Sequence, residues 1–264
     1  MKNRLIAKID EARRKHRKLF CAFLTLGYPS VQATEKLIEG FAQRGVDLIE
    51  LGFPFSDPLA DGPTIQFSSE KALEQGVTLQ DAFRVVQNLR QRGIDIPLIF
   101  FSYLNPIYHF GVRRFARALK SAGFDGLIVP DCPPEEDVLL WRTCRSAGIA
   151  PVFLVAPTTT PERARKIFAR SQGFLYYVSL RGVTGARKGL APDLAQNVKR
   201  ISKLSRKPVL IGFGVSTPEQ VKRISGWGGG VIVGSALVER IKASKGKLEP
   251  VLRFVETLVR PLGH

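Results

Sequence analysis

Leu48-Ile-Glu-Leu-Gly-Phe-Pro-Phe-Ser-Asp-Pro-Leu-Ala-Asp-Gly-Pro-Thr-Ile-Gln66 is the stretch that decides the fold of this 264-residue chain. It begins inside an apolar run, 46–49, that predicts a buried strand, and it continues as a loop rich in proline and glycine. Residues 45–70 contain no lysine or arginine, although the whole chain carries 40 basic and 23 acidic residues. The stretch holds three acids, Glu50, Asp57 and Asp61. Acids placed where a buried strand opens into a long loop indicate an active site.

The same order, an apolar run followed by an amphipathic one, repeats along the whole chain. Eight apolar runs predict strands at 20–25, 47–51, 97–102, 126–129, 151–155, 174–178, 208–211 and 230–233. Amphipathic runs predict helices at 34–43, 64–74, 79–92, 112–122, 135–147, 161–170, 193–204, 218–225 and 236–243, with an opening helix at 5–17 and a closing one at 247–259. Continuous apolar strands that alternate with helices indicate a parallel sheet buried on both faces.

Eight evenly spaced units in about 250 residues are typical of a TIM barrel. We therefore predict the α/β class and a (β/α)8 TIM barrel with extra N-terminal and C-terminal helices. An open, doubly wound sheet is the alternative, which the even spacing disfavours. No linker divides the chain, so we expect one domain over 1–264.

The composition bounds the class of protein. Apolar residues make up 44% of the chain, which is enough for a substantial core. No apolar run approaches the ~20 residues that span a bilayer, and the first residues lack the hydrophobic core of a signal peptide, so we expect a cytoplasmic protein without a membrane segment. Three cysteines and three histidines are scattered without metal-ligand spacing, so we expect no metal site.

The formal net charge of +17 is compatible with a nucleic-acid partner, an anionic surface or an anionic substrate. The basic residues lie mostly on predicted helices, without interleaved aromatics and without a nucleic-acid-binding motif. We interpret them as a soluble basic surface whose field attracts a phosphorylated substrate, and we expect no nucleic-acid partner.

Glu50 and Asp61 are the candidate catalytic pair. Active sites of TIM barrels lie at the carboxyl ends of the strands, so both side chains are expected in the mouth of the barrel. Two carboxylates in an apolar mouth have different proton affinities, so one can move a proton while the other stays ionised. The alternatives are that Glu50 caps a backbone amide, that Asp57 and Asp61 are ordinary turn residues, and that Asp61 caps the following helix.

Glycine-rich loops follow the last three predicted strands. They are Gly182-Val-Thr-Gly185, Gly212-Phe-Gly214 and Gly234-Ser235. Backbone amides after the seventh and eighth strands of a TIM barrel, with a helix N-terminus, commonly bind phosphate, and the Ser235 hydroxyl can add a donor. The alternative is that each glycine only permits a tight turn. The loop 181–192 either folds over a bound ligand or is simply a long loop.

Several motifs together resemble those of the tryptophan synthase alpha chain family. The most specific are the opening stretch, 48–66, and Gly182-Val-Thr-Gly-Ala186. The supporting motifs are Phe23-Leu-Thr-Leu-Gly-Tyr-Pro29, Asn105-Pro106, Gly212-Phe-Gly214 and Val233-Gly-Ser235. The resemblance covers essentially the whole chain. It implies a lyase that cleaves indole-3-glycerol phosphate into indole and glyceraldehyde 3-phosphate in tryptophan biosynthesis.

The resemblance also implies roles for individual residues. Glu50 is implied to be the acid–base residue at indole C3 and the side-chain hydroxyl, and Asp61 to accept the ring N–H. The implied phosphate cradle consists of Gly185, Gly214, Gly234 and Ser235. The implied indole contacts are Phe23, Tyr103, Ile128 and Tyr176. Thr184 is implied to lie in a loop that closes onto the Asp61 loop.

The family's alpha chain pairs with a beta chain, so the resemblance implies an alpha2beta2 heterotetramer. Pyridoxal phosphate belongs to the beta chain, and no cofactor is expected in this chain. The implied contact residues are Pro54, Asp57, Asn105 and Pro106. Residues 121–141 also lack lysine and arginine, so we infer that the beta-facing side is less basic than the rest.

Three alternatives remain open from the residues. They are a lyase that works without a beta chain, a barrel that has lost catalysis and acts as an activator or binding module, and another phosphate-binding isomerase or synthase. Two features depart from the family pattern. Ile128 stands where leucine is expected, which conserves volume, and the chain is unusually basic.

Overall fold

The computed structural model describes residues 3–178, 193–205, 207–212 and 214–263. Within them the chain forms one parallel sheet in the order β5-β4-β3-β2-β1-β9-β8-β7-β6. The strands are β1 (Leu19–Thr25), β2 (Leu48–Gly52), β3 (Leu98–Phe101), β4 (Gly126–Ile128), β5 (Ala150–Pro151), β6 (Phe153–Val155), β7 (Leu175–Val178), β8 (Val209–Gly212) and β9 (Gly230–Val233). Only Val152 separates β5 from β6, so the two ends of the ladder meet and the sheet is a nearly closed barrel.

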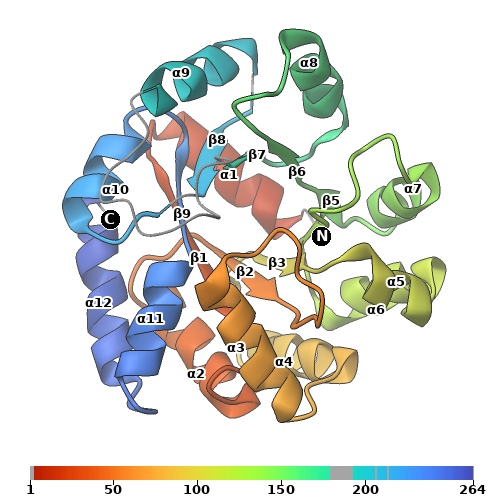
Figure 1. Cartoon of the computed structure of the whole chain (residues 1–264), viewed down its shortest axis with the longest axis vertical. Helices are drawn as coiled ribbons and strands as arrows, with labels where there is room; N and C mark the ends of the chain where they lie inside the picture. Colours follow the sequence, from red (N-terminus) through yellow and green to blue (C-terminus); the bar gives the residue numbers. More distant parts are fainter. Residues whose placement is uncertain (1–2, 179–192, 206, 213, 264) are drawn as a thin grey trace.

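Helices surround the strands on all sides (Figure 1). They are α1 (Arg4–Arg14), α2 (Val31–Ala42), α3 (Pro63–Glu74), α4 (Leu79–Gln91), α5 (Leu104–Phe110), α6 (Val112–Ala122), α7 (Val138–Ser146), α8 (Pro161–Arg170), α9 (Leu194–Leu204), α10 (Pro218–Ser225), α11 (Ser235–Ala243) and α12 (Glu249–Val259), followed by the 3-10 turn η1 (Arg260–Leu262). The predicted TIM barrel with extra helices at both ends is confirmed.

Three details differ from the sequence-based prediction. The predicted strand 151–155 is divided into β5, which pairs with β4, and β6, which pairs with β7. The short helix α5 was not predicted, because Pro106 in its first turn reads as a loop signal although the first turn tolerates proline. Helix α7 begins at Val138 rather than near 135, because the Asp137 carboxylate accepts the Leu140 N–H and caps the helix there.

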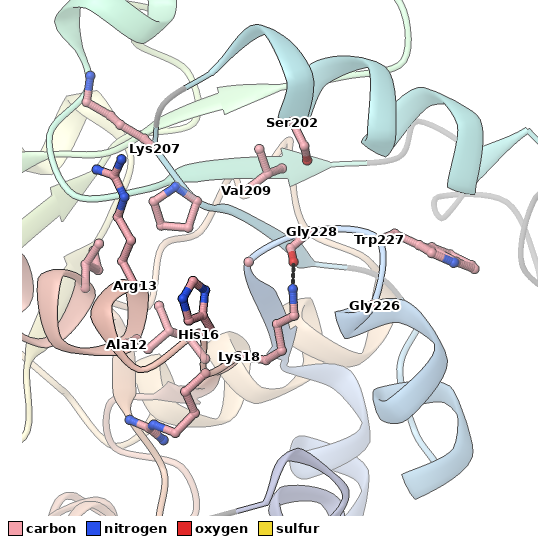
Figure 2. A pocket seen from close by; sticks show the side chains of 15 residues that line it. Ala12, Arg13, His16, Lys18, Ser202, Lys207, Val209, Gly226, Trp227 and Gly228 are labelled. Carbon is pink, nitrogen blue, oxygen red and sulfur yellow. Dashed lines mark hydrogen bonds between the residues drawn. The ribbon is translucent and has the colours of Figure 1, made fainter.

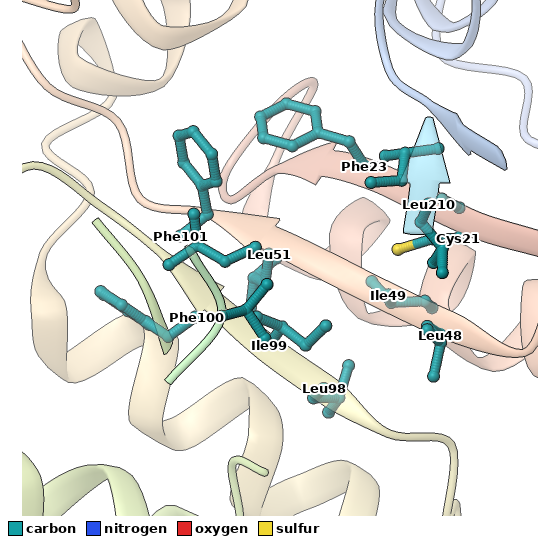
Figure 3. Close-up of a cluster of buried hydrophobic side chains, with 14 of the residues drawn as sticks. Cys21, Phe23, Leu48, Ile49, Leu51, Leu98, Ile99, Phe100, Phe101 and Leu210 are labelled. Atoms are coloured by element: carbon teal, nitrogen blue, oxygen red, sulfur yellow. The ribbon is translucent and has the colours of Figure 1, made fainter. Parts of the chain in front are cut away.

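Apolar side chains on both faces of the strands form a single core. Figure 3 shows part of it across β1, β2 and β3, with the rings of Phe23 and Phe101 next to each other at one end of the cluster. Their centroids are 5.7 Å apart in an edge-to-face arrangement. On the outer side of β3, Phe100 packs edge-to-face against Phe115 and Phe124. The strands are therefore continuous apolar runs because both of their faces are covered.

Helix α1 closes the amino-terminal end of the barrel. Leu5 is fully buried. A Cβ on Gly126 would lie 3.0 Å from the Leu5 side chain, and a Cβ on Gly173 would lie 3.4 Å from it. Ile9 approaches Gly173 in the same way, at 3.2 Å. The two glycines therefore let the apolar face of α1 sit directly on the sheet, and the functional end of the barrel is the opposite one.

Asp125 organises the charged groups at this closed end. Its carboxylate accepts hydrogen bonds from Arg90 Nη2 at 2.9 Å, the backbone N–H of Leu98 at 3.1 Å and Arg4 Nη1 at 3.3 Å. The side chain of Asp125 is only 3% exposed, whereas Asp95, the other carboxylate that Arg4 contacts, is 79% exposed. The buried pair thus ties α1 and α4 to the start of β3.

We predict that Asp125→Asn lowers the free energy of unfolding by about 3–5 kcal/mol, because it leaves the Arg90 guanidinium buried without its counter-charge. Asp95→Asn removes an equal charge from an exposed position and should cost less than about 1 kcal/mol. Urea denaturation of the two variants measures the difference. Equal losses would show that the Asp125 cluster does not stabilise the fold.

Candidate active site

Glu50 lies inside the barrel, two residues before the end of β2. In the sheet register it stands between Phe23 of β1 and Ile99 of β3. Its side chain is fully buried, and neither carboxylate oxygen has a hydrogen-bond partner of normal geometry among the described residues. An ionised carboxylate in such a place loses its hydration without compensation, so the protonated form is favoured.

Burial raises the pKa of Glu50 from 4.5 to about 8. The only opposing influence comes from the thiol of Cys21, which interacts with the carboxylate and lowers the pKa somewhat. Cys21 is also fully buried, and it lies on the neighbouring strand two positions before Phe23. Glu50 is therefore a carboxyl group that carries its proton at neutral pH, as a residue that moves protons should.

Asp61 lies in the loop between β2 and α3, held by Tyr103. The Tyr103 hydroxyl accepts the N–H of Ala60 at 3.0 Å and hydrogen-bonds to the Asp61 carboxylate. Burial raises the pKa of Asp61 to about 6, and the bond from Tyr103 acts in the opposite direction. At neutral pH Asp61 is therefore mostly ionised, while Glu50 is mostly protonated. Two carboxyl groups with pKa values separated in this way can take different roles in acid–base chemistry.

Asp61 does not cap α3, which was one alternative considered from the sequence. The N-cap of α3 is Gly62, and no side chain caps it. Instead the backbone carbonyl of Asp61 accepts the Gln66 Nε2 at 2.7 Å, which fixes the loop against the helix. The Asp61 carboxylate is thus free to contact Tyr103 and to face the barrel mouth.

The four residues expected around the indole lie on four different strands or their ends. Phe23 packs over Gly52 and Gly234. A Cβ on Gly52 would lie 2.5 Å from the Phe23 ring, and a Cβ on Gly234 would lie 3.4 Å from the Phe23 side chain. Ile128 is fully buried at the end of β4, in register with Phe101. Tyr103 is almost fully buried, and its ring stacks on Phe55. Its hydroxyl contacts make it a support for the Asp61 loop.

Tyr176 lies on β7 across the barrel from Glu50. Burial raises the pKa of its hydroxyl, and the charges of Glu50, Cys21 and Asp61 raise it further. The hydroxyl stands 2.5 Å from where a Cβ on Gly212 would be, so only glycine fits there. Tyr176 therefore brings the β7 side of the barrel toward the two carboxyls.

The predicted phosphate residues follow β8 and β9, which are neighbours in the sheet. Gly214 has a φ of 44°, and a Cβ there would meet nothing within 4 Å, so its backbone faces open space. Gly234 is the N-cap of α11, and Ser235, its first residue, is exposed. The first backbone N–H groups of α11 therefore lie at the barrel mouth, where they can bind an anion. Gly185 and Thr184, and the loop 181–192 that contains them, lie outside the described residues.

The match to known proteins extends over this whole framework. The family model described as tryptophan synthase alpha chain matches residues 9–263. The chain belongs to the tryptophan synthase alpha chain family. The alpha chain of Dehalococcoides mccartyi is 43% identical over 97% of this chain and 98% of its own length, and that of Geobacter sulfurreducens is 41% identical over 99% and 100%.

Solved structures agree with the family assignment. The alpha subunit of Legionella pneumophila superposes with a TM-score of 0.92 at 32% identity, and each chain is covered to 99%. A chain of Mycobacterium tuberculosis tryptophan synthase superposes with a TM-score of 0.90 at 35% identity, again with 99% of each chain covered. The alpha-chain framework described above is therefore shared at the level of the backbone.

The alpha chain exposes apolar side chains on the three segments that follow β2, β3 and β4 at the mouth of the barrel. Its large exposed side chains are Leu59 at 88%, Tyr108 at 53%, and Val138 and Leu139 at 52% each. The loops are tied together, since Asp131 accepts the Leu104 N–H and Asp137 accepts the Tyr108 hydroxyl. We call these four residues the apolar rim.

The predicted contact residues lie on the same loops. Asp57 and Asn105 are exposed, Pro106 is partly exposed in α5, and Pro54 is buried. The apolar rim was not found from the sequence, because single exposed apolar residues give no periodic signal. Cys21 was also missed as a neighbour of Glu50, because the sequence gives no signal for which residue a cysteine packs against. All three cysteines are buried and free.

Two further observations bound the site. Among the described residues, no group of three or more His, Cys, Asp or Glu side chains is placed to hold a metal ion. In the same part of the chain, every helix is too short or too polar to cross a bilayer.

We predict that the stability of the alpha chain falls as the pH rises from about 4.5 to about 8, because Glu50 ionises in the unfolded chain but keeps its proton in the folded one. Glu50→Gln should remove the contribution of Glu50, which is on the order of 3–5 kcal/mol over the window, and leave the smaller contribution of Asp61. Thermal or urea unfolding at pH 5 and pH 8.5 measures it. Asp57→Asn, at an exposed position of the following loop, should leave the slope in place. Parallel pH profiles for wild type and Glu50→Gln would contradict the raised pKa.

Proposed function

We propose that Glu50 and Asp61 of this alpha chain divide the proton chemistry of indole-3-glycerol phosphate cleavage, which releases indole and glyceraldehyde 3-phosphate. The observation that carries the proposal is the pair of carboxyls with separated pKa values, about 8 for Glu50 and about 6 for Asp61. The protein is a lyase of tryptophan biosynthesis by family.

The reaction needs one proton to move within the substrate. Protonated Glu50 gives its proton to indole C3, and the electrons of the C2–C3 double bond form the new C–H bond, which leaves positive charge on the ring nitrogen. The Glu50 carboxylate then takes the proton of the adjacent hydroxyl. A carbonyl forms, the bond between C3 and the glycerol carbon breaks, and its electrons restore the ring. Glu50 ends with its proton, ready for another turnover.

Asp61 acts on the charge that appears at the ring nitrogen. An ionised carboxylate that accepts the indole N–H stabilises the cationic intermediate more than the neutral substrate, so it lowers the barrier. Tyr103 supports this role because its hydroxyl holds both the Asp61 carboxylate and the preceding amide of Ala60. Phe23, Ile128 and Tyr176 supply the walls for the flat ring.

The phosphate end of the substrate is assigned to the loops after β8 and β9. Gly214, Gly234 and Ser235 would hold the phosphate by backbone N–H groups and a hydroxyl, at the positive end of α11. Gly185 belongs to the same phosphate proposal by its place in the sequence, and Thr184 belongs to the proposed closure of its loop onto the Asp61 loop. No step of this chemistry needs a cofactor in the alpha chain, since proton transfers and one retro-aldol cleavage account for every bond.

The alpha chain assembles with the beta chain of tryptophan synthase, and we propose an alpha2beta2 heterotetramer in the cytoplasm. The apolar rim, together with Asp57, Asn105 and Pro106, is the surface that we assign to the beta chain. Four large apolar side chains exposed on the segments after β2, β3 and β4 are typical of a protein interface. Pro54, being buried, would shape the loop rather than touch the partner.

A pH–rate profile tests the catalytic assignment. The rate constant kcat/KM for lyase turnover should rise as Asp61 ionises near pH 6 and fall as Glu50 loses its proton near pH 8. Glu50→Gln should reduce turnover by a factor of about 1,000 or more while the variant still folds and binds phosphate. A Glu50→Gln enzyme with wild-type turnover, or a profile without the alkaline limb, would overturn the assignment.

A charge placed in the apolar rim tests the partner surface. Leu139→Asp should weaken binding of the beta chain by about tenfold or more, because an interface core cannot solvate the new carboxylate. Leu73→Asp is the matched control, since Leu73 is an exposed leucine near the end of α3, outside the apolar rim. Titration of beta chain by light scattering or calorimetry gives both affinities. Equal effects of the two variants would remove the apolar rim from the interface.

A further inference from the structure

A basic cleft lies at the amino-terminal end of the barrel, opposite the active site. Its volume is about 430 Å³, within the range of small-molecule sites. It lies between the end of α1 and the segments that lead into β1, β8 and β9 (Figure 2). The polar and charged residues of its lining include Arg13, His16, Arg17, Lys18, Ser202 and Lys207.

The lining carries positive charge and no acidic side chain among the described residues. Arg17 is compensated by Asp47, with Nη2 and Oδ1 2.6 Å apart. Lys18 instead donates to the carbonyl of Gly228 at 2.8 Å, and Lys207 donates to the carbonyl of Phe168 at 2.5 Å. Carbonyls orient these ammonium groups without cancelling their charge. Arg13 is exposed and has no acidic partner in the part of the chain that the structure describes.

Helix dipoles account for only part of this charge. Basic residues are favoured in the last turn of a helix, where they offset its negative end, and Arg13 occupies such a position in α1. Lys18 and Lys207 lie beyond any helix, directly before β1 and close to β8. The pKa of Lys207 is lowered by burial and also by the charge of Arg145. Stabilisation of helix ends therefore does not explain all of the positive charge around the cleft.

Two polar groups of the cleft add hydrogen-bonding capacity. The Ser202 hydroxyl is buried and has no hydrogen-bond partner among the described residues. His16 has a φ of 51°, a left-handed conformation that is uncommon outside glycine, and its ring stands beside Lys18 at the cleft (Figure 2). A buried hydroxyl without a partner costs free energy unless a ligand or solvent satisfies it.

We propose that this cleft binds a small polyphosphate anion, held by Arg13, Lys18 and Lys207 with Ser202 as an additional donor. Arg13, Lys18 and Lys207 line one cleft, and each lysine ammonium donates to one carbonyl, so the remaining donors match the charge density and oxygen-rich surface of linked phosphates. Figure 2 shows the ring of Trp227 turned away from the basic side chains, so charge and not aromatic stacking provides the recognition. The site is separate from the proposed phosphate cradle, which follows the carboxyl ends of β8 and β9.

Calorimetric titration with inorganic tripolyphosphate tests the proposal. The intact chain is titrated at 150 mM salt with glycerol 3-phosphate in excess, so that the phosphate cradle of the active site is already filled. ADP in a parallel titration separates a free polyphosphate from a nucleotide, because tighter binding of ADP would assign the nucleotide. We expect one molecule of tripolyphosphate or ADP per chain.

A pair of double variants separates a site from a general field. Arg13→Gln with Lys207→Gln removes two lining charges and should weaken tripolyphosphate binding by about tenfold or more. Arg14→Gln with Lys203→Gln removes two charges from the last turns of α1 and α9, outside the lining, and should change binding less than about twofold. Thermal unfolding of wild type and both double variants checks that all three proteins are folded.

The proposal fails if wild type binds no tripolyphosphate under these conditions, or if the two double variants lose affinity equally. Lyase turnover is not the readout, so failure here leaves the catalytic assignment untouched, and the reverse holds as well.

Discussion

The uncompensated burial of the Glu50 carboxyl is the constraint on which the rest of the site depends. The parallel ladder between β1, β2 and β3 excludes water from this position and offers no cationic partner among the described residues. The same closure that makes the barrel stable therefore raises the pKa of the group that we propose to move protons. A lysine or arginine within reach would hold the carboxylate ionised, which explains the absence of basic residues from 45–70.

The loop after β2, residues 53–62, combines two surfaces. Asp61 faces the barrel mouth, and Leu59 stands almost fully exposed two residues earlier. Between them, the Ala60 N–H is held by the Tyr103 hydroxyl, and Tyr103 itself precedes α5, which Asp131 and Asp137 tie to the loop after β4. One continuous set of hydrogen bonds therefore positions both Asp61 and the apolar rim. The position of Asp61 depends on the position of the rim, and the reverse is also true.

Charge is distributed unevenly over the molecule for reasons that differ from place to place. At the closed end, Asp125 neutralises Arg90 and Arg4 and joins helices to the sheet. At the barrel mouth, Asp131 and Asp137 serve as hydrogen-bond acceptors for α5, and Glu135 pairs with Arg163. The base-free segment 121–141 thus includes acids with structural tasks, and the idea that the beta-facing side is less basic stays a prediction. In the basic cleft, by contrast, Arg13, Lys18 and Lys207 line one cavity without acidic partners among the described residues.

The sequence by itself determined the barrel, because alternating apolar and amphipathic runs report burial directly, and eight of them leave few alternatives. It also located Glu50 and Asp61, since acids at a strand end are conspicuous in an apolar context. Contacts between segments distant in the chain were decided only by the tertiary structure. They include the thiol of Cys21 beside Glu50, the Tyr103 hydroxyl on the Asp61 loop, the apolar rim and the basic cleft. Each depends on strand register or loop packing, which local sequence patterns do not encode, and pKa values follow from that packing because desolvation is a property of the folded surroundings.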